Sequence, residues 1–241
     1  MSSLLHKPPI LHGLIPSFSE GSPAPGGDGW ETGNALLFDG LNDEILLNST
    51  IDIALSQNFT CSVWAYLSSS GFLTVWTGNA ANRVVMVATS SDQILLNFGA
   101  QVLFDVPAIA LDTWHHLLFA RSGNNARVYW NGSESSSGQL TPAGNGISIN
   151  RFGVRNGGDL YYDGIMDDLY FWLDAVGTLA DAVAIYNGGV PVDPETVIPN
   201  ATHKYLFNES SGIALADGAA IPINGVLTNF ADPDSNWVSR L

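Results

Sequence analysis

Oxygen-bearing side chains gather at two places in the sequence where they could bind a hard cation. The first comprises Asp39, Asn42 and Asp43, and the second is the adjacent pair Asp167 and Asp168. Carboxylate and amide oxygens are the ligands that Ca²⁺ prefers, and the ion takes several at once. The alternative is structural, because Asp and Asn in turns also accept hydrogen bonds from nearby backbone N–H groups. Both interpretations stay open. We expect that the protein requires no cofactor, and calcium is the one that it could bind.

Four aromatic residues near expected strand ends or turns are candidates for stacking on sugar rings. They are Trp76, Trp130, Tyr161 and Tyr162. Sugar binding needs exposed aromatic faces with a few fixed polar groups around them. The alternative is that each belongs to the core or to ordinary surface, as most large aromatic side chains do. We name these four residues as candidate glycan contacts.

The residues that could perform catalysis are not spaced for it. Two carboxylates that act on a glycosidic bond must face one cleft, which on a strand requires alternate positions. The acid pairs 43–44 and 167–168 are adjacent, so their members point to opposite sheet faces. His115 and His116 are adjacent too and lack the spacing of a metal pair. We therefore expect no catalytic residues and a protein that is not an enzyme.

These residues need a framework of β-strands to position them. The segment 112–132 predicts a hairpin, with strands from Trp114 to about Arg121 and over 126–131, joined by a polar turn. Short runs rich in β-branched and aromatic residues predict further strands. The expected strands are 35–39, 44–48, 59–68, 71–77, 83–89, 93–98, 101–106, 114–121, 126–131, 146–154 and 161–173. One helix is expected at about 178–187, before two glycines.

Three segments together resemble one family. DTWHHLLFARSGNNARVYWNG (112–132) is similar to the central hairpin of laminin G-like domains, which belong to the concanavalin A-like superfamily of lectins and glucanases. ALLFDGLNDEILL (35–47) resembles the early strand of these domains, and YYDGIMDDLYFW (161–172) resembles their closing strand. The resemblance implies an all-β jelly-roll sandwich with a short helix after the closing strand. It also implies, for many relatives, calcium held at a sandwich rim.

The chain divides into three parts by composition. Residues 1–34 contain five prolines and a glycine-rich run, which predicts an extended arm. The arm is also rich in apolar residues, so we expect it to dock on a partner or on its own domain. Residues 35–190 form the expected sandwich. Residues 191–241 are a β-rich C-terminal extension that either completes the same sandwich or caps a neighbouring subunit.

Charge limits the partners. The net charge is −15 with eight Lys and Arg residues, whereas nucleic acids and anionic membranes are bound by clustered basic side chains. No stretch approaches the roughly 20 apolar residues of a membrane span. The single cysteine, Cys61, excludes an intramolecular disulfide, and the N-terminus lacks the apolar run of a signal peptide. We expect neither a nucleic acid nor a membrane as partner.

Together these features suggest a non-catalytic surface or adhesion protein of a virion, such as a bacteriophage head-decoration, fibre or receptor-binding component. Such proteins reach the outside by host lysis and need no export signal. We expect the arm to bind other virion proteins, the chain to form a homo-oligomer such as a trimer, and the sandwich to contact cell-surface glycan. The alternatives are a stand-alone extracellular lectin or carbohydrate-binding module, and a glycan-degrading enzyme with an unrecognised site.

Overall fold

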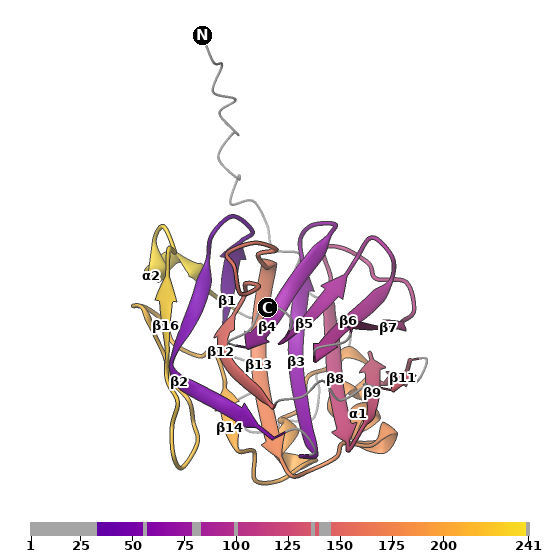
Figure 1. The fold of residues 1–241 in the computed structure, drawn as a ribbon. Coiled ribbons are helices and arrows are strands. Elements are labelled where there is room, and N and C mark those ends of the chain that lie inside the picture. The colour runs from indigo at the N-terminus through magenta and orange to yellow at the C-terminus, as the bar shows by residue number, and fades with distance from the viewer. Residues whose placement is uncertain are drawn as a thin grey trace.

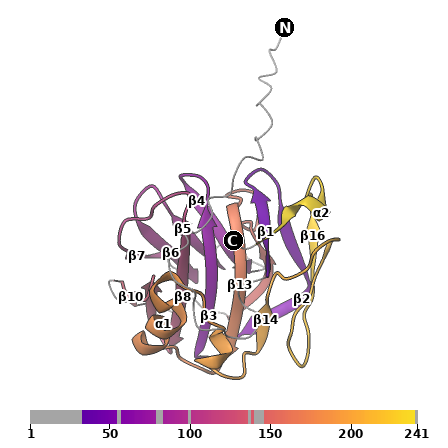
Figure 2. The same ribbon diagram turned by 180° about the vertical axis from the view of Figure 1, so that it is seen from behind.

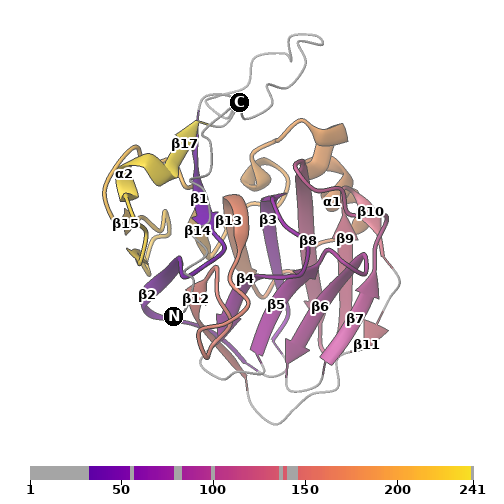
Figure 3. The same ribbon diagram turned by 90° about the horizontal axis from the view of Figure 1, so that it is seen from above.

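The computed structural model describes residues 33–54, 57–78, 83–98, 101–135, 138–139 and 146–239, which form two stacked β-sheets (Figure 1). Every strand pair between these residues is antiparallel. The view from above shows the two layers edge-on, with β13, β3 and β8 in one layer and β4, β5 and β6 in the other (Figure 3). No helix in the described part of the chain is long and apolar enough to span a membrane.

The first layer, sheet A, holds the expected hairpin. Its order is β10 (Ser133–Glu134), β9 (Asn125–Trp130), β8 (Trp114–Ser122), β3 (Phe59–Leu67), β13 (Asp163–Leu173), β1 (Asn34–Asp39) and β17 (Trp237–Ser239). In addition, β11 (Gly138–Gln139) pairs with β9, and β14 (His203–Tyr205) pairs with β13. The strands predicted from the hairpin segment are β8 and β9, so that prediction is confirmed.

The second layer, sheet B, faces it. Its order is β15 (Ala214–Leu215), β16 (Gly225–Thr228), β2 (Glu44–Ile53), β12 (Ile147–Phe152), β4 (Phe72–Gly78), β5 (Arg83–Ala88), β6 (Gln93–Phe98) and β7 (Gln101–Asp105). Each strand expected between residues 35 and 173 is present, and β2 is the one that runs well beyond its expected end. The all-β sandwich predicted from the sequence is thus confirmed.

One helix covers part of the outer face of sheet A (Figure 2). It is α1 (Leu179–Tyr186), and a capping box between Thr178 and Asp181 fixes its start. Its Ala182 and Ile185 pack on Leu118 of the sheet. The remaining helical segments are the 3₁₀ turns Asn187–Gly189 and Pro194–Thr196 and the short α2 (Pro233–Asn236).

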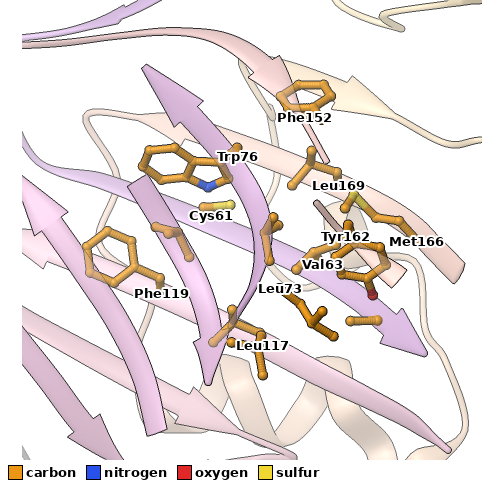
Figure 4. Packing of buried hydrophobic residues seen from close by; sticks show 14 of the residues in the cluster. Cys61, Val63, Leu73, Trp76, Leu117, Phe119, Phe152, Tyr162, Met166 and Leu169 are labelled. Atoms are coloured by element: carbon orange, nitrogen blue, oxygen red, sulfur yellow. The ribbon is translucent and has the colours of Figure 1, made fainter. Parts of the chain in front are cut away.

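The core lies between the sheets and is lined by large side chains from both. Trp76 of β4 and Phe119 of β8 approach from opposite layers, with Cys61 between them (Figure 4). Cys61 is a free, buried thiol, and burial raises its pKa to about 12. Cys61 therefore packs as a small apolar side chain of the core.

The C-terminal part of the chain belongs to this same core. β17 pairs with β1, β14 with β13, and β16 with β2, so residues from 203 onward extend both sheets. Tyr205, Leu227 and Trp237 join the core cluster. Of the two alternatives for 191–241, the structure has the first, in which the segment completes the sandwich. The arm boundary also shifts, because β1 begins at Asn34; residues 1–32 lie outside the described part.

Candidate functional site

The acidic turn between β1 and β2 is held by its own side chains. Asp39 Oδ1 accepts hydrogen bonds from the backbone N–H groups of Leu41 (2.8 Å) and Asn42 (3.3 Å). Asp43 Oδ2 accepts one from the backbone N–H of Asp39 (2.9 Å). Gly40 has a φ of +72°, which suits glycine, and its turn lies against the side chain of Asp163. These are the hydrogen bonds expected if Asp39 and Asp43 shape the turn by accepting from backbone N–H groups.

One oxygen of this turn remains without a partner. Asp43 is 1% exposed, and its Oδ1 has no hydrogen-bond partner in the described part of the protein. Burial raises the pKa of Asp43 to about 6; the bond from the Asp39 N–H acts against this shift, and the charge of Asp39 adds to it. An unpartnered carboxylate oxygen fits a cation ligand, although the described residues offer no group of three His, Cys, Asp or Glu side chains placed to hold a metal. Calcium binding at 39–43 stays a prediction.

The second acidic pair is far from this turn. Asp39 is opposite Asp163 in the β1–β13 pairing, and Asp167 lies four residues further along β13, opposite Trp64 of β3. At about 3.3 Å per residue, roughly 13 Å of strand separates the two places. Asp167 and Asp168 are both buried within sheet A. The structure therefore keeps Asp39, Asn42 and Asp43 together and does not bring Asp167 and Asp168 to them.

The raised pKa of Asp43 predicts how stability depends on pH. The pKa in the folded state exceeds the unfolded value of about 3.9, so stability from this group is complete below pH 4, falls as pH rises to about 6, and then stays level. The Asp43→Asn variant should therefore be more stable than wild type at pH 7 in EDTA, by about 1–2 kcal/mol, and should lose this advantage at pH 4.

Urea unfolding of both proteins at pH 4, 5, 6 and 7 measures this difference. Asp52→Asn on the exposed side of β2 is the control, because Asp52 is exposed. A wild-type advantage over Asp43→Asn that grows with pH in EDTA would contradict the argument. Calcium that stabilises wild type but not Asp43→Asn at pH 7 would support the cation prediction.

The proposed stacking role is wrong for three of the four aromatic residues. Trp76, Trp130 and Tyr162 are each at most 1% exposed and lie in the core cluster. Trp130 stacks on His115 at a ring distance of 4.6 Å, and Tyr162 donates its hydroxyl to the carbonyl of Ile165 (3.1 Å). A sugar cannot reach any of these rings, because the sandwich closes over them. Only Tyr161, which is half-buried, remains a candidate.

Tyr161 belongs to a structured loop, residues 153–162, that joins β12 to β13. The backbone N–H of Tyr162 donates to the carbonyl of Gly153 (2.7 Å) and closes the loop at its base. Near the tip, Arg155 and Asp159 form a bridge and a two-pronged ion pair. Because the loop leads into Asp163, the residue opposite Asp39, it lies at the same end of the sandwich as the acidic turn. Tyr161, Arg155 and Asp159 form our candidate glycan-contact group.

The 153–162 loop borders the outer face of sheet B. Register places Thr74, Met86, Leu95 and Leu103 on one transverse row of this face. The next row contains Arg151, Thr77, Val84, Asn97 and Gln101. Arg151 donates to Glu44 (2.8 Å), and the remaining side chains of both rows are uncharged. Hydroxyls, amides and apolar side chains arranged in this way are suited to a neutral, hydroxyl-rich ligand.

The buried histidines have structural partners. His115 contacts the carbonyl of Ala110 (2.8 Å) and the side chain of Asn131 (3.0 Å). His116 Nε2 lies 2.8 Å from Ser62 Oγ, and burial lowers the pKa of His116 to about 3. A serine–histidine pair can activate a nucleophile, but both members of this pair are fully buried beneath α1 and its connecting turn, away from substrate.

Sequence reasoning did not single out the ion pair of the loop or Thr74. The RNGGD run (155–159) indicates a turn, and the spacing of Arg155 and Asp159 was the available signal for the ion pair. No sequence signal marks Thr74, because its location depends on the pairing of β4 with β5.

Comparison with known proteins agrees with this geometry. The sequence model of the concanavalin A-like lectin/glucanases superfamily matches residues 39–178. No curated protein matches the chain at a significant level.

Solved structures share the fold at low sequence identity. A putative carbohydrate binding protein from Bacteroides ovatus aligns with a TM-score of 0.63 and 14% identity, covering 83% of this chain and 59% of that one. The present chain therefore spans about three fifths of the Bacteroides protein. A native heptameric SAP-like pentraxin from Limulus polyphemus aligns with a TM-score of 0.52 and 16% identity, covering 66% of this chain and 84% of that one. At these identities the likeness concerns the fold alone.

Proposed function

Because this chain belongs to the concanavalin A-like lectin/glucanase superfamily, we propose that it recognises carbohydrate as a lectin-like module without catalytic activity. The superfamily match, which runs from the acidic turn to the start of α1, is the observation that carries the proposal. The fold supports it, because the same two-layer sandwich occurs in a putative carbohydrate binding protein. Fold alone does not fix a ligand, so the site residues must be tested directly.

The burial of acidic residues supports a role in binding rather than in catalysis. A general acid or base must come within hydrogen-bond reach of the substrate. Asp43, Asp167 and Asp168 are at most 2% exposed, so these carboxylates do not line an open cleft. Tyr161 and the Arg155–Asp159 pair, in contrast, lie at the surface, where a ring face and fixed polar groups can contact sugar hydroxyls.

A glycan array tests the proposal. We expect purified protein to bind a restricted set of neutral glycans, and Tyr161→Ala to lose most of that binding while its unfolding curve stays like that of wild type. Running the array in calcium and in EDTA shows whether the 39–43 turn contributes. No binding in either buffer, or release of reducing sugar from a polysaccharide panel, would overturn a non-catalytic lectin role. The second result would favour the glycan-degrading enzyme.

For the biological setting, we propose the surface of a virion, with residues 1–34 docked on other virion proteins and the sandwich displayed as a homo-oligomer, such as a trimer. The proline-rich, apolar composition of that arm supports docking. A stand-alone extracellular lectin is the alternative. Light scattering of the full chain and of a chain lacking residues 1–32 distinguishes them in part. A monomer whose arm is cleaved rapidly by protease would contradict the docked arm.

A further inference from the structure

A small apolar strip lies on the outer face of sheet B, separate from the main core. It consists of Val84 and Met86 of β5 and Leu95 of β6, each less than 5% exposed. An outer sheet face normally contacts water, so such complete burial needs a cover. Among the described residues, Leu160 of the 153–162 loop packs against this cluster.

Polar atoms without partners border this strip. Thr74 is opposite Met86 in the β4–β5 pairing, and its Oγ1 is buried without a hydrogen-bond partner among the described residues. Asn150 Oδ1 and Arg151 Nε, on neighbouring β12, are in the same condition. Buried polar groups are normally paired, so the unpartnered hydroxyl of Thr74 beside the strip is unusual. A ligand hydroxyl that reached Thr74 would supply the missing partner.

The tip of the loop is held less firmly than its base, where Val154 and Tyr162 are fully buried and the Gly153 N–H donates to the carbonyl of Val75 (3.1 Å). Leu160 has a φ of +51°, a left-handed conformation that is unfavourable for a bulky residue. The Arg155–Asp159 ion pair ties the loop to itself rather than to the sheet, and its side chains are 36% and 51% exposed. The bond from the Asn156 N–H to Thr77 Oγ1 measures 3.4 Å, which is long. A ligand needs to supply little energy to lift such a loop.

We propose that the strip and its polar border form a saccharide subsite, that the 153–162 loop is its lid, and that Leu160 fills the place of the sugar ring while the lid is closed. This inference rests on the proposed function and assigns its ligand a location. The C–H face of a pyranose would pack on Met86 and Leu95, and its hydroxyls would pair with Thr74 Oγ1 and Arg151 Nε. A neutral sugar fits, because the strip is uncharged and Arg151 is paired with Glu44.

The first experiment removes the plug. Leu160→Gly takes away the side chain and relieves the strained backbone, and Leu160→Ala takes away most of the side chain without changing any residue of the candidate glycan-contact group. Titration calorimetry with maltotriose, cellotriose and triacetylchitotriose should show about tenfold tighter binding of at least one sugar by Leu160→Gly, because a larger fraction of molecules is open. Leu160→Ala should shift affinity in the same direction. Ile221→Gly, at a residue 83% exposed elsewhere, is the matched control.

The second experiment addresses the subsite itself. Thr74→Val removes the unpaired hydroxyl, so the sugar-free protein should melt at a higher temperature, whereas the Leu160→Gly/Thr74→Val double variant should lose the gained affinity. Hydrogen exchange of residues 153–162 should speed up when the sugar binds, since the lid then opens.

The outcomes separate this inference from the proposed function. If wild type binds a sugar and both lid variants bind it with unchanged affinity, the lid is wrong and the lectin role stands. If no variant binds any of the three trisaccharides, the subsite is wrong, and the glycan array decides the lectin role independently. If Thr74→Val lowers the melting temperature, the hydroxyl has a partner and the polar border is misassigned.

Discussion

Asp217→Ala is expected to lower the free energy of unfolding by about 3–5 kcal/mol. The Asp217 carboxylate is fully buried and accepts four hydrogen bonds. One comes from His203 Nδ1 (2.7 Å), and the others come from the backbone N–H groups of Lys204 (3.0 Å), Ala219 (3.0 Å) and Ile223 (2.9 Å). Alanine leaves these donors buried without an acceptor, which costs more than the loss of an exposed bond.

The pKa of Asp217 gives this prediction a pH dependence. Burial by itself would raise that pKa, but the bonds from His203 and from the backbone of Ile223 and Lys204 outweigh burial, and the pKa lies below its usual value. Stability from Asp217 is therefore complete above the unfolded pKa of about 3.9 and is lost as pH falls through the lower folded value. The gap between wild type and Asp217→Ala should shrink below about pH 4.

Urea unfolding at pH 7, 5, 4 and 3 measures the gap. Asp52→Ala, on the exposed side of β2, should change stability by no more than about 0.5 kcal/mol. A loss for Asp217→Ala as small as that of the control would mean that the C-terminal segment is only loosely attached to the sandwich.

A large loss of stability in Asp217→Ala would also show that residues 191–241 fold together with the sandwich. The sequence left open whether residues 191–241 complete the sandwich or cap a neighbour, because their short strands carry no information about their pairing partners. Asp217 sits between β15 and β16 and holds His203 of β14, so it joins both sheets. The boundary at residue 190 is therefore a change in composition and not a boundary between folded units. A chain that ended there would lack β14, β16 and β17.

The strands could be predicted from the sequence because the signals for a strand lie within one short stretch of chain. Alternation and turn residues define the hairpin of β8 and β9 within one stretch of chain. Exposure is different, because it depends on what packs against each face. Every residue between Gly164 and Trp172 in β13 is buried, since the core covers one face, and on the other Tyr170 and Trp172 bond to Asp193 and Ile198 of the segment that follows α1. Alternation in sequence could not show which aromatic rings a ligand reaches.

The candidate site was predicted in part for the same reason. Asp39, Asn42 and Asp43 are close in sequence and form one turn. Asp167 looked equivalent by residue type, but a rigid strand keeps it roughly 13 Å away. The sequence placed a connection only at residues 155–160, between two expected strands, and the contact of the 153–162 loop with the outer strip depends on a fold in which β12, β4, β5 and β6 lie side by side.

Trp76→Ala and Tyr161→Ala should have opposite effects, which tests the reassignment of the aromatic residues. Trp76 is fully buried, with ring distances of 6.1 Å to Phe98 and 6.3 Å to Phe171, so its loss should cost about 3–5 kcal/mol of stability. Tyr161 is half-buried in the loop, and its loss should change stability by no more than about 1 kcal/mol.

Sugar binding should follow the reverse order. Trp76→Ala, measured well below its lowered melting temperature and per folded molecule, should bind glycan with the affinity of wild type, because no sugar touches the core. Tyr161→Ala should bind at least tenfold more weakly if its ring contributes about 1.4 kcal/mol or more. Thermal unfolding and calorimetry on the same samples measure both quantities. If folded Trp76→Ala lost glycan binding and Tyr161→Ala kept it, the assignment of the glycan contact to Tyr161 would be wrong, and the buried aromatic residues would again be the candidates.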